Sequence, residues 1–298
     1  QKVPCAGSLA EYGVAYREVP LNEQKAPDLP GIQAALREDP TIKLVHIQRS
    51  RGYNTRPSLT VDGIRRIVEA VRQVRPDVTI FADNCYGEFT EKLEPTQVGV
   101  DLIAGSLIKN LGGGIAPNGG YMCGTAACIE QCAYRMTTPG LGREVGASLG
   151  HTRSLYMGLF HAPHVVGEAM KTAVFASGLF QALGYTVSPR PEEYRGDIIQ
   201  TILLRDEPSL IAFCRGMQKG APVDSFVVPE PSEQPGYVSK VIMAAGAFTN
   251  GSSIELSADA PLREPYAAYM QGGLNYASGR IGVLLAAQSM LEEGCLTL

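Results

Sequence analysis

The sequence predicts an α/β fold, with a mainly parallel β-sheet that carries helices on both faces and a smaller α+β part toward the C-terminus. Residues 43–48 and 78–82 are short apolar runs of strand length, and a loop and an amphipathic segment, residues 60–74, lie between them. Thr60 has the residue type of a helix N-cap. A strand, a loop, a helix and a second strand in this order build a right-handed crossover onto a parallel sheet.

Further short elements flank this unit. Residues 102–106 and 120–123 are candidate strands on either side of a glycine-rich loop, and residues 32–37 have helical character. We interpret residues 14–19 as a strand without a preceding element to pair with, so we expect a part of the fold to precede residue 1. Polar side chains at the carboxyl ends of parallel strands converge on one crevice, which is the usual ligand site of such a sheet.

A long alanine-rich helix is predicted for residues 161–183, with Pro163 in its first turn and Gly184 as its C-cap. It separates an expected large domain, residues 1–160, from a smaller C-terminal domain, residues 161–298. The elements expected in the smaller domain are strands at residues 186–188, 198–204 and 238–248 and helices at residues 208–216 and 282–293.

The composition excludes several classes of protein. Of the 298 residues, 45% are hydrophobic, which is enough for a substantial core, and 26 basic and 30 acidic residues are interspersed, so no basic stripe is available for nucleic acid. No apolar run reaches the roughly 20 residues of a membrane span, and the first residues do not resemble a signal peptide. Seven cysteines without a CxxC pair are typical of reduced thiols. We therefore expect a cytoplasmic protein without a nucleic-acid or membrane partner.

The stretch from residue 81 to residue 114 carries the most specific chemistry. FADNCYGEF contains Asp83 at the end of a predicted strand, and GSLIKNLGGG contains Lys109 beside small residues and glycines. Pyridoxal-5′-phosphate (PLP) needs an unprotonated lysine amine that condenses with its aldehyde and a carboxylate that keeps its pyridine nitrogen protonated. Burial lowers the pKa of a lysine, which favours Lys109 for the first task, and Asp83 suits the second. Ser106 can bond the cofactor phosphate, and Tyr86 the ring hydroxyl or the phosphate.

Beyond these residues, the sequence resembles a known family. Five segments, RSRGYNTRPSLT, FADNCYGEF, SLIKNLGGGIAPNGGY, LFHAPHVVGEA and YMQGGLNYA, are similar to the methionine gamma-lyase-like family, which is often labelled as aluminium resistance proteins and is related to the cystathionine-synthesis lyases. The resemblance implies a fold-type-I PLP enzyme with a seven-stranded type of sheet. It also implies cleavage of a carbon–sulfur bond in an amino-acid substrate such as methionine or cystathionine, by a homodimer or homotetramer.

Two departures from this family concern the cofactor. Its members carry a longer N-terminal part with a phosphate-binding loop at a helix start, and this chain begins after it. Many relatives also place an Asn-Pro pair before the aspartate strand, and its amide touches the ring oxygen. Arg56 and Pro57 form the corresponding pair here, so Arg56 is the candidate for that contact.

No motif identifies the arginine that binds the substrate carboxylate. Arg263 and Arg280 are candidates from the C-terminal part. Arg49 and Arg51 follow a predicted strand end, where anionic groups would sit, and Tyr53 lies beside them in the same loop. We expect Arg263, Arg51 and Tyr53 to contact the substrate.

Other kinds of site have less support. Pro117 stands where the last glycine of a dinucleotide loop that starts at Gly112 belongs. His151 and Arg153 face the cofactor or a neighbouring subunit, or else lie in a solvated loop. The candidate ligands of a metal site are His161, His164, Cys123, Cys128 and Cys132. No CxxC or HExxH motif accompanies them. We interpret the three cysteines as a buried helical face. Two further functions stay open, another PLP reaction such as transamination and a non-catalytic metal-stress or scaffold role.

Overall fold

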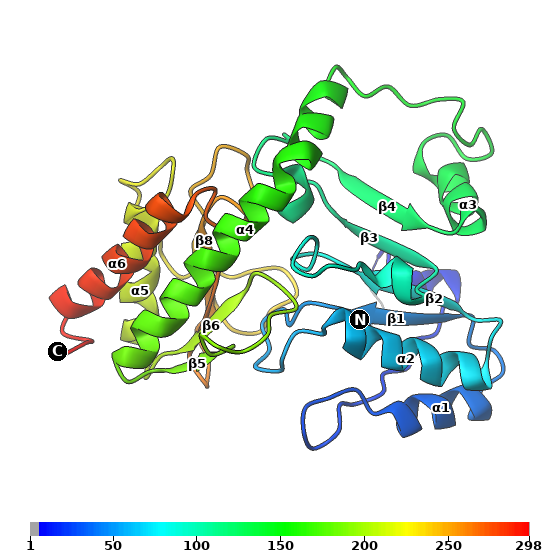
Figure 1. Cartoon of the computed structure of the whole chain (residues 1–298), viewed down its shortest axis with the longest axis horizontal. Coiled ribbons are helices and arrows are strands. Elements are labelled where there is room, and N and C mark those ends of the chain that lie inside the picture. The colour runs from blue at the N-terminus through cyan, green and yellow to red at the C-terminus, as the bar shows by residue number, and fades with distance from the viewer. Residues whose placement is uncertain (1–5, 298) are drawn as a thin grey trace.

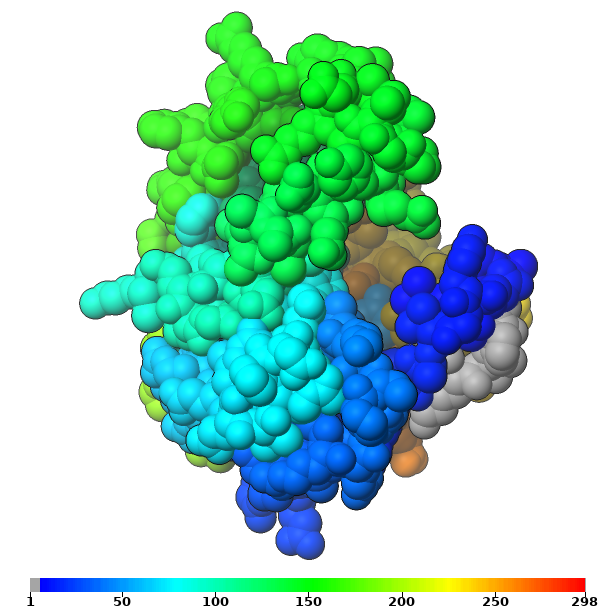
Figure 2. Space-filling view, turned by 90° about the vertical axis from the view of Figure 1, so that its right-hand side faces the viewer, coloured from blue at the N-terminus to red at the C-terminus, as the bar shows by residue number. Residues whose placement is uncertain are grey.

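A computed structural model describes residues 6–297 of the chain (Figure 1). They form two β-sheets, one of four strands in the order β1-β2-β3-β4 and one of five strands in the order β5-β6-β9-β8-β7. The long helix α4 (Thr152–Ala182) follows the first sheet in the chain and precedes the second. In Figure 2 the part around α3 (Ala126–Met136), in green, stands above the blue and cyan body formed by earlier residues. No helix among the described residues is long and apolar enough to cross a membrane.

The first sheet confirms the predicted parallel crossover. β1 pairs in parallel with β2, and β2 pairs in parallel with β3. β4 pairs antiparallel with β3, because the chain turns back after β3. Ser106 lies opposite Gly120, and the Leu107 amide donates to the Gly119 carbonyl at 2.9 Å. The described residues place four strands in this sheet, and their other five strands form a separate antiparallel sheet, so the seven-stranded type of sheet stays a prediction. The strands are β1 (Leu44–Gln48), β2 (Thr79–Asp83), β3 (Leu102–Ser106) and β4 (Gly120–Gly124).

Helices α1 (Leu29–Glu38) and α2 (Val61–Val74) pack on this sheet through their apolar stripes. Thr60 caps α2 as predicted, because its Oγ1 accepts a hydrogen bond from the Gly63 amide at 3.0 Å. Both helices join one buried cluster with the strands, which includes Leu36, Ile64, Ile67, Val71, Ile80 and Ile103.

The strand expected at residues 14–19 is wrong. The chain instead forms a short 3₁₀ helix, η1 (Leu9–Tyr12), and then runs on without strand pairing, with Val14 and Tyr16 exposed. A strand needs a neighbouring backbone for its hydrogen bonds, and no strand of the described residues lies beside this segment.

Helix α4 begins at Thr152 and not at residue 161, so Pro163 lies inside the helix instead of in its first turn. The helix continues past the proline, and its first third, which contains the proline, packs closely on η3 (Asn110–Gly112). A Cβ added at Gly158 would lie 2.3 Å from the Gly112 carbonyl oxygen, so only glycine allows this approach. At the other end Gly184 has a φ of 83° and ends the helix as predicted.

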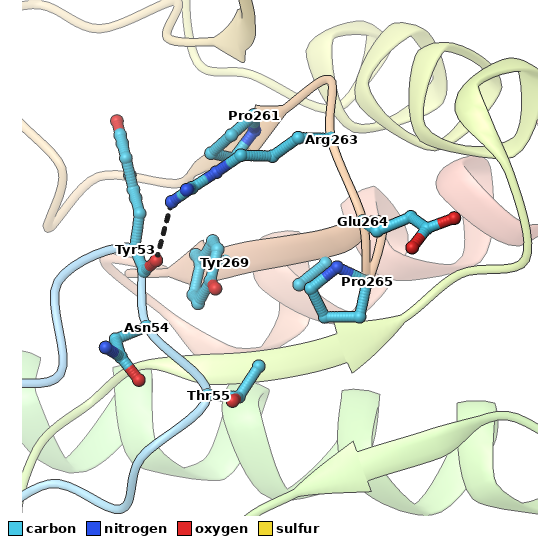
Figure 3. Close-up of a pocket in the computed structure, with 9 residues that line it drawn as sticks. Tyr53, Asn54, Thr55, Pro261, Arg263, Glu264, Pro265 and Tyr269 are labelled. Atoms are coloured by element: carbon cyan, nitrogen blue, oxygen red, sulfur yellow. Dashed lines mark hydrogen bonds between the residues drawn. The ribbon is translucent and has the colours of Figure 1, made fainter. Parts of the chain in front are cut away.

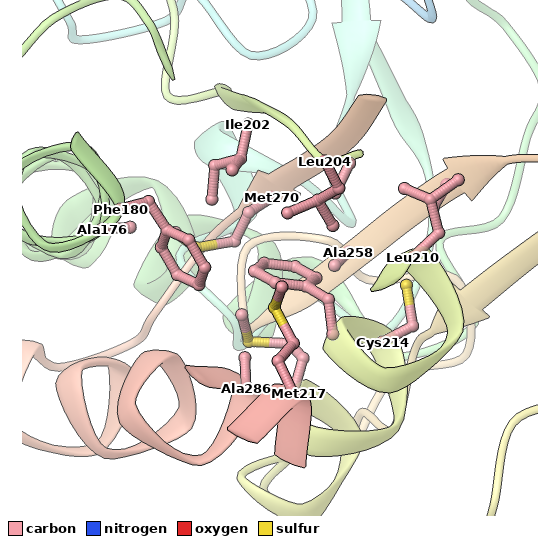
Figure 4. Close-up of a cluster of buried hydrophobic side chains, with 14 of the residues drawn as sticks. Ala176, Phe180, Ile202, Leu204, Leu210, Cys214, Met217, Ala258, Met270 and Ala286 are labelled. Carbon is pink, nitrogen blue, oxygen red and sulfur yellow. The ribbon is translucent and has the colours of Figure 1, made fainter. Parts of the chain in front are cut away.

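The second sheet has antiparallel pairing throughout and packs against α4 and α5 (Glu207–Lys219), and α6 (Tyr276–Glu292) packs on these two helices. Figure 4 shows the core between them, where Phe180 from α4 meets Met217 from α5 and Met270 from the sheet. Two of its strands escaped the sequence analysis because short runs such as SADAP lack the β-branched and aromatic residues typical of strands. The strands are β5 (Thr186–Ser188), β6 (Gln200–Leu203), β7 (Val241–Ala244), β8 (Ser257–Pro261) and β9 (Ala267–Gln271), and the remaining 3₁₀ helix is η2 (Pro95–Val98).

Candidate active site

The ends of β2 and β3 bring together the residues on which the predicted chemistry depends. Asp83 is the last residue of β2 and lies opposite Ala104 of the parallel strand β3. Lys109 follows the end of β3 after a short turn, and its Nζ lies 4.7 Å from the centroid of the Tyr86 ring. Adjacent parallel strands therefore place a carboxylate, an amine and a phenol at one sheet edge.

A strained turn after β2 positions the Tyr86 ring. The Cys85 amide donates to Asp83 Oδ1 at 3.1 Å, and Tyr86 itself adopts a φ of 70°. This left-handed conformation costs a bulky residue about 1–3 kcal/mol, so the surroundings must hold it. One such restraint is the Ile198 amide, which donates to the Tyr86 carbonyl at 3.1 Å and ties the turn to the segment before β6.

The proton affinity of Lys109 differs from the expectation. Burial lowers the pKa of its amine, but Tyr86, Cys85 and Asp83 raise it, and the net pKa lies above the ordinary value. The prediction that burial leaves this amine unprotonated is therefore wrong, because the groups around it outweigh the burial. Sequence analysis also missed Cys85, whose pKa burial raises to about 11 in spite of the nearby Lys109, so the thiol is neutral at neutral pH.

Hydrogen bonds fix the turn that carries Lys109. Ser106 Oγ accepts from the Ile108 amide at 3.3 Å, which leaves its hydroxyl proton for another acceptor. Asn110 is fully buried and donates through Nδ2 to the Glu88 carbonyl at 3.0 Å. The turn after β3 is thus attached to the turn after β2, and Lys109 is held against Asp83 and Tyr86.

Glu88 is a buried carboxyl group directly under this turn. Its side chain is 1% exposed, and its Oε1 accepts a hydrogen bond from the Tyr121 hydroxyl at 2.9 Å, whereas its Oε2 has no partner among the described residues. Burial raises the pKa of Glu88 to about 7. A protonated, neutral carboxyl group therefore lies beneath the lysine turn below this pH.

The two arginines after β1 are used to hold the structure together. Arg49 is fully buried and pairs with Glu91 at 2.9 Å and Glu94 at 3.3 Å, so its charge is already neutralised. Arg51 donates through Nη1 to the Ser188 carbonyl at 3.0 Å and to Thr201 Oγ1 at 3.0 Å. Arg51 therefore joins the loop after β1 to the second sheet, and a contact with the substrate stays a prediction.

Arg56 closes the same loop. Its guanidinium donates to the carbonyl oxygens of Pro57 at 2.9 Å, of Gln48 at 3.0 Å and of Ser50. These bonds orient the group onto the backbone at the end of β1. Contact with a cofactor ring remains a prediction for this residue.

Two of the residues expected to contact the substrate lie together in a cavity of about 170 Å³ (Figure 3). Arg263 donates through Nη2 to the Tyr53 carbonyl at 3.4 Å, and both residues line this cavity with the turn after β8. Arg280 lies apart, because it is exposed on α6 and its guanidinium sits 5.6 Å from the centroid of the Tyr276 ring. Of the two arginine candidates, Arg263 is therefore the one near Tyr53.

A second cavity, of about 190 Å³, connects the predicted cofactor and substrate residues. Tyr86 and Tyr53 both line it, and Asp259 of β8 and Gln271 of β9 contribute polar groups. Sequence analysis missed Asp259. The available signal was a single carboxylate among the small residues of SADAP, which is too common to single out by itself.

The residues considered for a metal site do not gather around one point. The expected buried cysteine face is wrong, because Cys123 is exposed on β4 and Cys128 and Cys132 are partly exposed on α3. The described residues contain no group of three metal-ligating side chains close enough to hold an ion. Both His161 and His164 are exposed along α4.

Comparisons with known proteins agree with the resemblance seen in the motifs. The family model described as methionine gamma-lyase matches residues 1–291. The chain belongs to the methionine gamma-lyase family. This family member is 46% identical over 288 residues to the uncharacterized protein YnbB of Bacillus subtilis. The match covers 97% of this chain and 68% of the relative.

Solved structures extend the comparison to the fold of this methionine gamma-lyase family member. A carbon-sulfur lyase involved in aluminum resistance from Clostridium novyi has a TM-score of 0.90 and 52% identity, and the match covers 96% of this chain and 66% of the other. A protein assigned as a cystathionine beta-lyase involved in aluminum resistance from Clostridium acetobutylicum has a TM-score of 0.92 and 49% identity, with 97% and 67% covered. The chain thus spans about two thirds of the length of these relatives.

A more distant match shows the fold alone. The methionine gamma lyase CalE6 from Micromonospora echinospora is 17% identical with a TM-score of 0.54, over 92% of this chain and 70% of the other. The mixed α/β fold of this family member is therefore that of fold-type-I enzymes.

Proposed function

We propose that this chain is a PLP-dependent carbon–sulfur lyase that acts on a sulfur amino acid such as methionine or cystathionine. The observation that carries the proposal is the meeting of Lys109, Asp83 and Tyr86 at the ends of β2 and β3. Membership of the methionine gamma-lyase family and the likeness to a carbon-sulfur lyase of 52% identity support the choice of reaction.

The residues present fit PLP by their chemistry. An amine, a carboxylate, a phenol and a hydroxyl group gather at one edge of the first sheet, where ligands of α/β proteins usually bind. Lys109 would hold the cofactor aldehyde, Asp83 would keep a proton on the pyridine nitrogen, and Ser106 has a free hydroxyl proton for the phosphate. When bound, the cofactor supplies an electron sink for the electrons that the Cα–H bond leaves behind.

The protein's own contribution is proton transfer and positioning. Once the substrate amine replaces it, the Lys109 amine can take the proton from Cα, since its Nζ is held over Tyr86 and close to the turn after β2. The Tyr86 ring lies beside this amine, and the buried Asn110 fixes the turn that carries Lys109.

Absorbance spectroscopy tests the cofactor assignment. Adding PLP to the wild-type chain should produce a visible band, which Lys109→Ala should lose. Lys92→Ala removes an exposed lysine from the same half of the chain and should keep the band. A band of equal strength in Lys109→Ala would contradict the proposal.

A product assay tests the reaction type. Incubation with cystathionine or methionine should release a thiol together with a 2-oxo acid and ammonia. An aminotransferase would instead transfer the amino group to an added 2-oxo acid and release no thiol, which would contradict the lyase assignment. A chain that shows neither reaction and no band would favour a non-catalytic role.

A further inference from the structure

The second cavity lies between the turn after β2 and the second sheet, and half of the residues that line it are tyrosines. Four tyrosines line it: Tyr53 from the loop after β1, Tyr86 from the turn after β2, Tyr237 from the loop before β7 and Tyr269 from β9. The Tyr53 ring centroid is 5.2 Å from that of Tyr237 and 5.5 Å from that of Tyr269. The faces of such rings carry negative charge density and attract cations within about 6 Å.

A carboxylate completes this lining. Asp259 projects from β8 into the cavity, where the Tyr53 hydroxyl and the Gln271 amide approach it. Among the described residues, no lysine or arginine forms an ion pair with Asp259. Burial raises the pKa of Asp259, against the effects of Tyr53, Gln271 and Lys109. A partly buried carboxylate without an ion-pair partner gains from a cationic ligand.

The cavity is also next to the reacting group. Tyr86 lies between the cavity and Lys109, because its ring centroid is 4.7 Å from Lys109 Nζ and the residue also lines the cavity. A substrate whose Cα lies at Lys109 can therefore extend past Tyr86, with its far end between the tyrosines and Asp259. The far end of a thioether amino acid is the part that leaves with the sulfur.

We propose that this cavity binds an ammonium group at the far end of the substrate, with Asp259 as its counter-ion, so that the enzyme prefers thioether amino acids that carry a second amino group. The inference rests on the proposed function, since Lys109 has to act on the near end. Such a site would distinguish diamino thioethers from substrates such as methionine, whose far end is an uncharged methyl group. A neutral alkyl end would give the Asp259 carboxylate no positively charged partner.

A matched pair of substrates tests this preference. S-(2-aminoethyl)-L-cysteine and S-propyl-L-cysteine have side chains of the same length and differ in a terminal ammonium against a methyl group. Each would react with one water to give pyruvate, ammonia and a thiol, which is cysteamine or propanethiol: the C–S bond breaks, the sulfur gains a proton, and no oxidant or reductant is consumed. We expect the wild-type kcat/KM to be about 10- to 100-fold higher for the amine, as a charge-assisted contact provides.

Asp259→Asn keeps the shape of the side chain and removes its charge. This variant should lose the preference: kcat/KM for the amine substrate should fall through a higher KM, and kcat/KM for the propyl substrate should not fall with it, because only the ammonium group uses the charge of Asp259. Glu192→Gln removes an exposed carboxylate from the loop after β5 and should keep the preference. The PLP band and the melting temperature of each variant report whether it is folded.

A second variant probes the aromatic wall. Tyr237 is 51% exposed, so Tyr237→Leu should fold, and it should reduce the preference for the amine by about 2- to 10-fold. Equal kcat/KM values of the wild type for both substrates would overturn the inference and leave the proposed function standing. An equal loss of kcat/KM on both substrates in Asp259→Asn would do the same. No turnover of either substrate together with no PLP band would overturn the proposed function and the inference with it.

Discussion

The edge of the first sheet and the inner wall of the second sheet contribute different things to the candidate site. The first sheet supplies Asp83 and Lys109 from the ends of adjacent parallel strands, and the turns that carry them bond to each other through Asn110 and Glu88. The second sheet supplies Asp259 and Tyr269 from antiparallel strands β8 and β9, and they meet Tyr53 and Tyr86 across a cavity. In the proposed function, the first region serves the reaction and the second serves the choice of substrate.

This difference teaches how the fold separates two demands. A reacting group needs fixed geometry, and the hydrogen-bonded turns after β2 and β3 provide it. A binding subsite needs a complementary shape and charge, which side chains on the face of a second sheet can change without moving the reacting group. Variants in the first region should therefore affect all substrates alike, and variants in the second should affect some substrates more than others.

The largest effect is expected from Asp83→Asn. If Asp83 holds the pyridine proton as proposed, loss of its charge should lower kcat/KM by about 10²- to 10³-fold, because the electron sink would no longer be stabilised. The reduction should be equal for S-(2-aminoethyl)-L-cysteine and S-propyl-L-cysteine, in contrast to Asp259→Asn. Steady-state kinetics on both substrates measure it, and a loss confined to one substrate would break the proposed division between the two regions.

A stability effect of intermediate size is expected from Glu88, which lies beneath the first region. Because its pKa is raised to about 7, the folded chain holds a proton that the unfolded chain releases near its ordinary pKa of about 4.5. Stability should therefore fall as the pH rises from about 4.5 to 7, by up to about 3 kcal/mol from this group. Glu88→Gln should flatten this part of the curve of unfolding free energy against pH. Denaturant titrations between pH 4.5 and pH 8 measure it, and identical slopes in the two proteins would contradict the assignment.

The smallest effects are expected from a helix cap in each region. Thr60 accepts from the Gly63 amide at the start of α2, and Asp206 accepts from the Ser209 amide at the start of α5. Replacement by alanine should cost about 1 kcal/mol in either case, because each leaves one amide without a partner. Urea unfolding of both variants compares the regions directly. A much larger loss for one cap would show that its region limits the stability of the whole chain.

Much of the first region could be predicted from the sequence because its signals are local. The cap at Thr60, the strands that end at Asp83 and Ser106, and the position of Lys109 after the second of them all follow from residues close together in the chain. Adjacent parallel strands then bring such residues to one edge without further information.

The errors came from properties that depend on surroundings. Residues 14–19 have the composition of a strand, but no strand of the described residues lies beside them. Pro163 ordinarily marks a helix start, yet α4 continues through it where the helix packs closely on η3. The pKa of Lys109 was expected to fall with burial and instead rises, since Tyr86, Cys85 and Asp83 lie beside it.

The sequence by itself determined the family, through the five segments that resemble it, and the order of the chemical groups along the chain. It also determined most of the helices, because capping and apolar spacing within a short segment specify a helix. The tertiary structure alone decided that Asp259 would stand in the same cavity as Tyr53 and Tyr86, and that Arg51 and Arg56 would hold backbone and hydroxyl groups. These contacts join residues far apart in the chain. They arise from the packing of two sheets, which no local pattern records.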